Sequence, residues 1–301
     1  MGKIKKKSIY SSRSDNIFFM IVNSILFIVL VIVLIPMLNI IASSFSSGNA
    51  VAAGRVFIWP VDFSLEGYKA VFRNNQVLSG YANTIYYTFF GTLINVIMTV
   101  LAAYPLSRSD FYGRNFITFL FTFTMLFSGG IIPNYLLMKD LGLIDTRWAM
   151  LLPNAITVYN MIITRTYFQT TIPNELLEAS RLDGCSDIKF LILIVMPLSK
   201  AIIAVITLYY AVTHWNMFFN AYIYLNRKEL FPLQLILRDI LLANSIDPSM
   251  MTDPVLLKEK QNLTDLLKYS LIIVASLPVW CIYPFVQKYF VQGVMIGSIK
   301  G

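Results

Sequence analysis

Six long apolar runs dominate this chain of 301 residues and limit the folds that it can adopt. A helix needs roughly 20 apolar residues to cross the hydrocarbon core of a bilayer, which is about 30 Å thick. Because lipid offers no hydrogen-bond partner to the backbone, each run is predicted to be a helix, whose backbone groups pair internally. The sequence therefore predicts an all-α, polytopic membrane protein with six transmembrane helices. The runs cover residues 17–42, 82–104, 115–138, 148–170, 195–225 and 269–292.

The composition supports a membrane protein. Apolar residues make up 57% of the chain and charged residues only 13%, which lies outside the range of soluble domains. The first run is too long for the apolar part of a secretory signal, and no Ala-x-Ala site follows it, so it is expected to be a retained helix. The net charge of +8 is assigned to contact with anionic lipid headgroups, and no nucleic acid partner is expected.

Basic residues set the expected orientation. Positive charge before the first span is expected to stay in the cytoplasm, and the next basic residue is Arg55. Six crossings then place both termini and the segment 171–194 in the cytoplasm, and the segment 226–268 outside. The predicted organisation is a cytoplasmic basic segment 1–16, a six-span transmembrane domain 17–292 and a cytoplasmic tail 293–301. The basic residues in question are Lys3, Lys5, Lys6, Lys7 and Arg13.

Two further segments carry local structural signals. Ser128-Gly129-Gly130 and Pro133 interrupt the third run, which predicts a kink there. In the segment 226–268, which is predicted to lie outside the membrane, apolar residues recur at helical spacing from Leu233 to Leu241, which predicts an amphipathic helix. Two interpretations of this helix stay open at this point: it rests on lipid, or it contacts a protein outside the cell.

The segment between the fourth and fifth runs is the most informative. Pro173, Glu175 and Glu178 favour the start of a helix, and Gly184 can end it in a left-handed cap. Ser186 can cap a second helix, and Asp187 favours its N-terminus. The expected product is two short helices that meet at a bend, which a cytoplasmic partner could grip.

The same segment resembles a known family motif. Glu178-Ala179-Ser180, three residues, Gly184, nine residues, Ile194, one residue and Met196-Pro197 are similar to the EAA loop of binding-protein-dependent ABC importer permeases. In that family the motif reads Glu-Ala-Ala-x3-Gly-x9-Ile-x-Leu-Pro, so Ser180 replaces an alanine and Met196 a leucine. The resemblance implies a loop that docks on an ATP-binding subunit. The residues it implies for coupling to the ATPase are Glu178, Ala179, Ser180, Asp183, Gly184 and Pro197.

Two more segments extend the resemblance to nearly the whole chain. The end of the chain resembles the Gly-rich tail of carbohydrate permeases such as the smaller maltose-importer subunit, which implies that Gly297, Lys300 and Gly301 contact the ATPase. Residues 127–137, followed by 141–143, resemble Gram-positive permeases for complex oligosaccharides.

The resemblance also implies a fold, a location and partners. The implied fold is a type I importer permease in a bacterial cell membrane. The implied partners are a second, homologous permease in a heterodimer, two ATP-binding subunits and an extracellular solute-binding protein. No Gly-x4-Gly-Lys-Ser/Thr loop occurs in the sequence, so ATP and Mg are expected on the partner subunits, with no cofactor and no enzymatic activity in this chain.

Polar side chains in the fourth and fifth runs have two interpretations. They can hold helices together through interhelical hydrogen bonds, or they can line a translocation path where aromatic rings stack on sugars and amides bond hydroxyl groups. The lone histidine, His214, is interpreted as structural, and no metal-ligand spacing is present. The candidate path residues are Tyr159, Asn160, Trp215, Asn216 and Asn220.

Two other classes of function are weaker. A secondary carrier or channel for a small polar solute would need a coupling-ion site, yet every Asp and Glu falls in a loop or at the end of a run. A membrane-embedded enzyme would need a catalytic constellation, which the runs lack. The sequence therefore predicts the permease subunit of an ATP-driven importer for a carbohydrate, expected to be an oligosaccharide.

Overall fold

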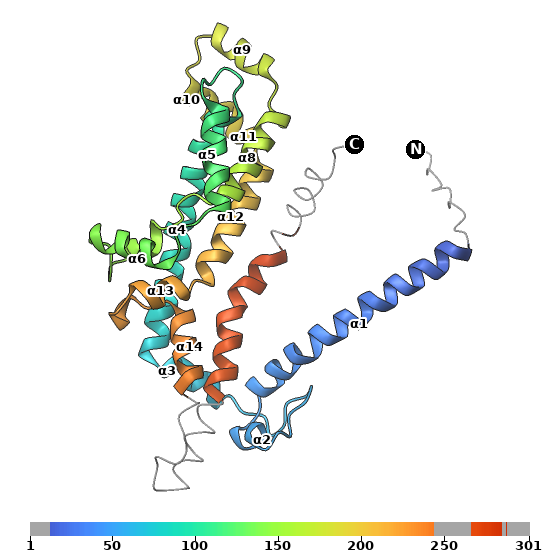
Figure 1. Cartoon of the computed structure of the whole chain (residues 1–301). Helices are drawn as coiled ribbons and strands as arrows, with labels where there is room; N and C mark the ends of the chain where they lie inside the picture. The colour runs from blue at the N-terminus through green and yellow to red at the C-terminus, as the bar shows by residue number, and fades with distance from the viewer. Residues whose placement is uncertain (1–12, 244–265, 285–286, 288–301) are drawn as a thin grey trace. The chain divides into compact units, whose positions relative to one another are not determined.

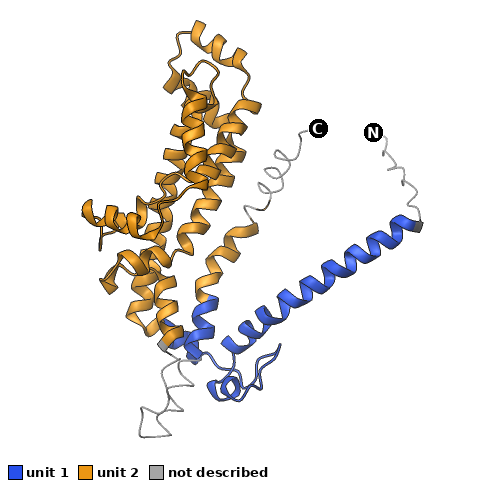
Figure 2. Cartoon of the chain, in the orientation of Figure 1, with its two compact units in different colours: residues 1–71, 247–273 blue, residues 72–246, 274–301 orange. Residues whose placement is uncertain are grey.

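The computed structural model describes residues 13–243, 266–284 and 287, and within them it contains helices and no strand. The predicted all-α class is confirmed. The chain divides into two compact units, which are described separately (Figure 2). Unit 1 comprises residues 1–71 and 247–273, and unit 2 comprises residues 72–246 and 274–301.

Unit 1 is dominated by one long apolar helix. It contains α1 (Arg13–Ser44), α2 (Gly48–Ala52) and most of α3 (Glu66–Arg73). None of the most apolar window of α1 is buried, as expected for a helix whose surroundings are lipid. The end of α1 is anchored by Asn39, whose amide donates to the carbonyls of Val56 and Phe57 at 3.0 and 2.9 Å.

Unit 2 is built around α4 (Asn75–Ser107). The helices that pack on it most extensively are α8 (Val158–Thr171), α12 (Lys200–Trp215) and α14 (Leu233–Ala243) (Figure 1). The largest apolar core of unit 2 lies between α4, α8 and α12, with Phe168 and Ile206 fully buried in it.

Small and polar residues let the helices approach α4 closely. A side chain added at Gly91 would overlap the imidazole ring of His214, and one added at Gly80 would overlap Ile236. The Nε2 atom of His214 lies 2.7 Å from the amide oxygen of Asn95, and the histidine is buried. His214 is therefore a packing residue between α12 and α4, as its structural interpretation requires.

Gly91→Ala is expected to destabilise unit 2. The added methyl group has to displace the His214 ring, and overpacking of this kind costs about 1–3 kcal/mol. The thermal midpoint of the purified protein in detergent should fall. The matched control is Gly129→Ala, where the nearest atom to the new methyl group is 3.7 Å away, so an equal loss in both variants would contradict the tight contact.

Several predicted runs are broken rather than straight. The third run forms α5 (Arg114–Leu126) and α6 (Ile131–Asp140), bent by 115°, which confirms the predicted kink. The fourth run forms α7 (Trp148–Leu151) and α8, separated at Asn154, whose φ is +60°. In the fifth, α12 meets the preceding helical segment at 85° and is followed by α13 (Phe219–Tyr224).

The count of six spans stays a prediction. Within the described residues, three helices are long and apolar enough to cross a membrane: α1, α4 and the helix over Leu266–Pro284. The number rises to five when each bent pair counts as one span. The fourth run is not counted as a span, because the break at Asn154 leaves α8 only 14 residues long.

Side chains of α4 satisfy the backbone of the broken segments. Asn95 donates to the carbonyls of Asn154 and Ala155 at 2.8 and 3.1 Å, between α7 and α8. Asn83 donates to the carbonyls of Glu229 and Phe231 at 2.6 and 3.2 Å, ahead of α14. Irregular backbone inside a membrane protein needs such internal partners, and α4 supplies them.

The amphipathic helix predicted from Leu233 to Leu241 is confirmed as α14, but its apolar face does not rest on lipid. Leu233 is fully buried and Ile236 is 6% exposed, and both lie against Gly80 of α4. The Leu233 N–H also donates to the Thr84 hydroxyl at 2.8 Å. The lipid interpretation is therefore wrong for these residues. The segments 1–12, 244–265 and 288–301, which include the predicted tail, lie outside the described residues.

Candidate functional site

Residues 173–195, here called the elbow, form two short helices that meet at a bend. They are α9 (Asn174–Leu182) and α10 (Asp187–Phe190), and a π-helix over Leu191–Val195 continues α10 towards α12. In Figure 1 they lie at the end of unit 2 where α8 ends and α11 (Met196–Leu198) begins.

Local sequence chemistry explains the bend. Gly184 has a φ of +73°, its N–H donates to the Arg181 carbonyl at 3.0 Å, and the Cys185 N–H donates to the Ser180 carbonyl at 2.9 Å. This pair of bonds is the Schellman motif that ends α9, and glycine adopts its left-handed residue without a steric cost. The Ser186 hydroxyl then accepts from the Lys189 N–H at 3.4 Å and caps α10. The predicted pair of helices is confirmed.

The elbow has an outer and an inner face. The motif residues Glu178, Ala179, Asp183 and Gly184 are exposed on the outer face. The inner face carries the buried side chains Leu177, Ser180, Phe190 and Leu191, and the apolar ones join the core of unit 2. Ser180, at the position where the motif has alanine, donates its hydroxyl hydrogen to the Leu177 carbonyl at 2.8 Å, so its polar group is satisfied internally. Pro197 is exposed, in α11.

Leu182 is a candidate site residue that sequence reasoning missed. It ends α9 next to Asp183, and its side chain is 90% exposed. A leucine that protrudes beside the exposed carboxylates of a segment predicted to be cytoplasmic offers apolar surface that a partner could bury. The signal was present in the sequence, since Leu182 follows Glu178 by one helical turn and so shares its face.

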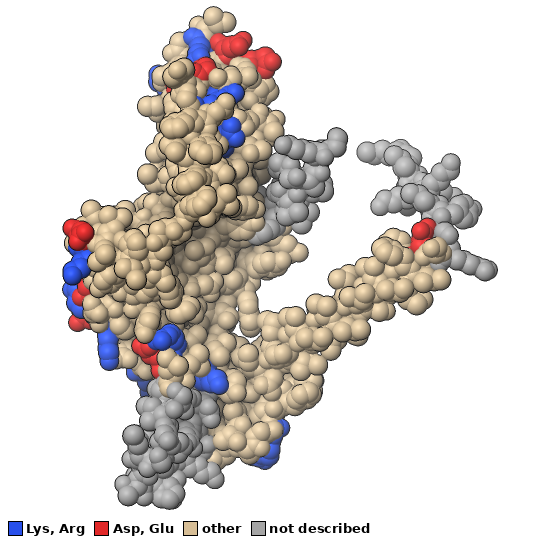
Figure 3. Space-filling view, viewed as in Figure 1, with Lys and Arg blue, Asp and Glu red and all other residues tan. Residues whose placement is uncertain are grey.

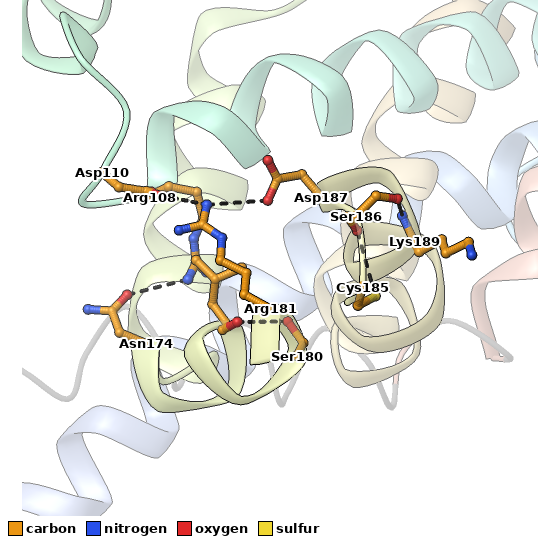
Figure 4. Close-up of polar contacts among 10 residues, drawn as sticks. Arg108, Asp110, Asn174, Ser180, Arg181, Cys185, Ser186, Asp187 and Lys189 are labelled. Atoms are coloured by element: carbon orange, nitrogen blue, oxygen red, sulfur yellow. Dashed lines mark hydrogen bonds and ion pairs between the residues drawn. The ribbon is translucent and has the colours of Figure 1, made fainter. Parts of the chain in front are cut away.

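Charged side chains connect the elbow to the α4–α5 turn, residues 108–113. The Arg181 guanidinium lies between two carboxylates, at 2.6 Å from Asp110 of the turn and 3.4 Å from Asp187 of α10 (Figure 4). The hydrogen bond from Arg181 lowers the pKa of Asp110, and the same bond raises the pKa of Arg181. Both groups therefore stay ionised at neutral pH. Sequence reasoning missed this contact because residues 110 and 181 are far apart along the chain.

A second arginine, Arg108, lies beneath the first. Its side chain is buried, with only 6% exposed, and its Nη2 atom lies 3.4 Å from the amide oxygen of Asn174 at the start of α9. Its guanidinium carbon also lies 5.7 Å from the centre of the Phe190 ring of α10. One side chain from the turn thus contacts both helices of the elbow.

A groove of about 440 Å³ separates part of the elbow from the α4–α5 turn. Most of the side chains that line the groove are uncharged, and four are charged. Within the described residues no group of three side chains could hold a metal ion. The groove is lined by Leu101, Tyr104, Pro105, Arg108, Asp110, Phe111, Leu177, Arg181, Asp187, Ile188 and Leu191.

The five candidate path residues differ in their burial within this chain. Asn160 and Trp215 are buried, and the Trp215 indole donates to the Ala275 carbonyl at 2.9 Å. Tyr159 and Asn216 are exposed, and Asn220 is half-buried. The Asn216 amide donates to the Val212 carbonyl at 2.9 Å within its own helix end. Asn160 and Trp215 thus have the burial of helix-packing residues within this chain, and the placement of all five residues along a path stays a prediction.

Charged side chains are unevenly distributed over unit 2. In the space-filling view, Lys, Arg, Asp and Glu cluster around α9 and α10 and again from the level of α6 downwards, and the stretch between them on this face carries none (Figure 3). An uncharged surface between two charged regions is expected where a domain is embedded in lipid.

The comparisons with known proteins decide the family. No family model matches the chain. It is 38% identical over 287 residues to the polygalacturonan/rhamnogalacturonan transport system permease protein YtcP of Bacillus subtilis, covering 95% of this chain and 99% of that protein. The chain belongs to the family of ABC importer permeases. It is also 41% identical over 270 residues to protein LplC of the same organism, covering 90% of each chain.

A solved structure agrees with this assignment. An ABC transporter involved in the import of the acidic polysaccharide alginate contains a chain that matches 94% of this permease, with 36% identity and a TM-score of 0.86. ABC importer permeases are integral membrane subunits whose transport is driven by ATP. Membership therefore excludes the alternative of a self-sufficient carrier or channel.

Proposed function

We propose that this permease imports a carbohydrate and that its elbow receives the movement of the ATP-binding subunits. The observation that carries the proposal is the outer face of the elbow, where Glu178, Leu182 and Asp183 are all exposed on a helix closed by a hydrogen-bonded bend. A partner that grips this face can move α12 through the helical segments that follow, and so change which side of the membrane is open.

The proposed complex follows the pattern of the family. It contains this chain, a second and different permease, two ATP-binding subunits that hold ATP and Mg, and an extracellular solute-binding protein. Both termini lie in the cytoplasm, and Gly297, Lys300 and Gly301 contact the ATP-binding subunits. The basic residues before α1 support this orientation.

We further propose that the substrate is an oligosaccharide containing uronic acids. The proposal rests on two relatives, at 38% and 36% identity, whose names refer to polygalacturonan/rhamnogalacturonan and to alginate. All of these polymers carry a carboxylate on the sugar ring. Tyr159, Asn216 and Asn220 are the candidates for contact with the substrate, because their side chains are not fully buried within this chain.

Uptake by cells tests this function. A strain that lacks this permease is expected to lose uptake of labelled trigalacturonate, and the intact gene should restore it. Vanadate should block uptake by membrane vesicles that contain the complex. Maltotriose, a neutral sugar of the same length, serves as the matched control. Unchanged trigalacturonate uptake in the deletion strain would contradict the proposed substrate, and uptake that persists in vanadate would contradict ATP-driven import.

A further inference from the structure

The contact between the elbow and the α4–α5 turn joins two segments that are distant in the sequence. Asp110 and Arg181 are 71 residues apart, and Arg108 and Asn174 are 66 residues apart. Below these polar contacts, Leu177, Phe190 and Leu191 of the elbow share one apolar core with Tyr104 and Leu106 at the end of α4. The elbow is therefore packed on the end of α4 as well as connected to α8 and α12.

Arg108 fixes the relative position of these segments. A buried guanidinium is costly unless its donors are matched, and here one donor reaches Asn174 while the Nε atom has no partner. Arg114 donates to the Arg108 carbonyl at 3.1 Å and holds the backbone of the turn from the other side. The Arg108 side chain reaches α9 and α10 at once, so a shift of either helix relative to the turn would disturb its contacts.

Arg181 adds a second connection at the rim of the groove. Its two carboxylate partners come from different elements, since Asp110 belongs to the turn and Asp187 to α10. Exposed ion pairs contribute little free energy. These ion pairs instead restrict the relative position of the turn and α10, because the arginine has to lie between them to reach both carboxylates (Figure 4).

We propose that the elbow and the cytoplasmic end of α4 move as one rigid body, with Arg108 and Arg181 as its positioning residues. The proposal rests on the proposed function of the elbow. In it, movement of the ATP-binding subunits reaches α4 directly and does not have to pass through α12 alone. This matters because α4 contacts α8, α12 and α14 and bonds the backbone of the broken segments through Asn95 and Asn83.

A cross-link across the contact tests the proposal. The native thiols, Cys185 and Cys281, are first replaced by serine, and Asp110→Cys and Arg181→Cys are then introduced together. The complex is purified through a tag on this chain and reconstituted with its binding protein and trigalacturonate. ATP hydrolysis stimulated by the binding protein is measured before and after treatment with a short bis-maleimide. Hydrolysis without sugar is measured in parallel, so that a wrong choice of sugar does not affect the comparison.

The uncross-linked double variant is expected to lose stimulation by about tenfold, and the cross-link is expected to restore it to within about twofold of the parent. Restoration distinguishes a positioning role from a purely structural one, since the cross-link replaces the connection and not the charges. Each single-cysteine variant, treated with the same reagent, controls for modification alone. A cross-link that stops hydrolysis would show that the two segments have to move apart, and full stimulation before cross-linking would show that the contact is dispensable. Either result overturns the proposal.

Glu178→Lys separates failure of this proposal from failure of the proposed function. Glu178 lies on the outer face of the elbow, is exposed, and is not among the residues that line the groove. One result would be that Glu178→Lys abolishes stimulation while the double-cysteine variant is fully stimulated without its cross-link. In that case the elbow couples to the ATPase, but the rigid-body proposal is wrong. If Glu178→Lys is also fully stimulated, the proposed function of the elbow is wrong.

Discussion

Replacing Gly184 with proline is expected to abolish uptake while the protein remains inserted in the membrane. Proline fixes φ near −65°, whereas Gly184 has a φ of +73°, and proline also lacks the N–H that donates to the Arg181 carbonyl. The cost of about 3 kcal/mol or more lowers the population of the correctly bent elbow by about two orders of magnitude. Uptake in cells and the amount of permease in the membrane fraction are the two measurements.

Gly142→Pro is the matched control for this variant. Gly142 follows α6, has a φ of +66°, and donates its N–H to the Lys139 carbonyl at 2.9 Å, so the local damage is equivalent. It lies in a turn outside the elbow, on the side of the membrane predicted to be external. Stimulation of ATP hydrolysis by the binding protein should survive in Gly142→Pro and disappear in Gly184→Pro. Equal loss in both variants would mean that the defect is one of folding.

Leu182→Asp is expected to release the ATP-binding subunits from the permease. Burying a leucine side chain in a partner contributes about 1.5–3 kcal/mol, and a buried, unpaired carboxylate at the same place is unfavourable in addition. Binding should weaken by at least about tenfold, because each 1.4 kcal/mol corresponds to a factor of about ten. The measurement is the amount of ATP-binding subunit that copurifies with a tag on this chain.

The stability of the permease itself should not change in Leu182→Asp, because the side chain is 90% exposed and makes few contacts within its own chain. Leu182→Met keeps an apolar side chain of similar volume and is expected to retain the ATP-binding subunits. Normal copurification with Leu182→Asp would remove this residue from the docking surface.

Features that depend on neighbouring residues could be predicted from the sequence. The apolar runs predicted membrane helices because each helix satisfies its own backbone, whatever surrounds it. The bend of the elbow was predictable for the same reason, since Gly184 and Ser186 act within a few residues of themselves. The kink after α5 follows from glycine residues inside the run. The motif spacing, which is also local, indicated the family that the comparisons then confirmed.

Features that depend on distant contacts were decided only by the tertiary structure. The apolar face of α14 was assigned to lipid or to a binding protein, yet it packs on α4 at Gly80, about 150 residues away in sequence. The roles of polar residues of α4, such as Asn83 and Asn95, could not be predicted from the sequence. Their partners are backbone carbonyls of irregular segments that are distant in the sequence.

The same division applies to the site. The sequence by itself determined that residues 173–195 form a bent pair of helices with exposed carboxylates, because capping and turn formation are local. Only the tertiary structure decided that Arg108 is buried beneath that pair and that Arg181 faces Asp110, because side chains more than 60 residues apart meet only when α4, α8 and α12 have packed together. Periodicity and spacing describe what each segment does alone, and the free energy of packing determines which segments meet.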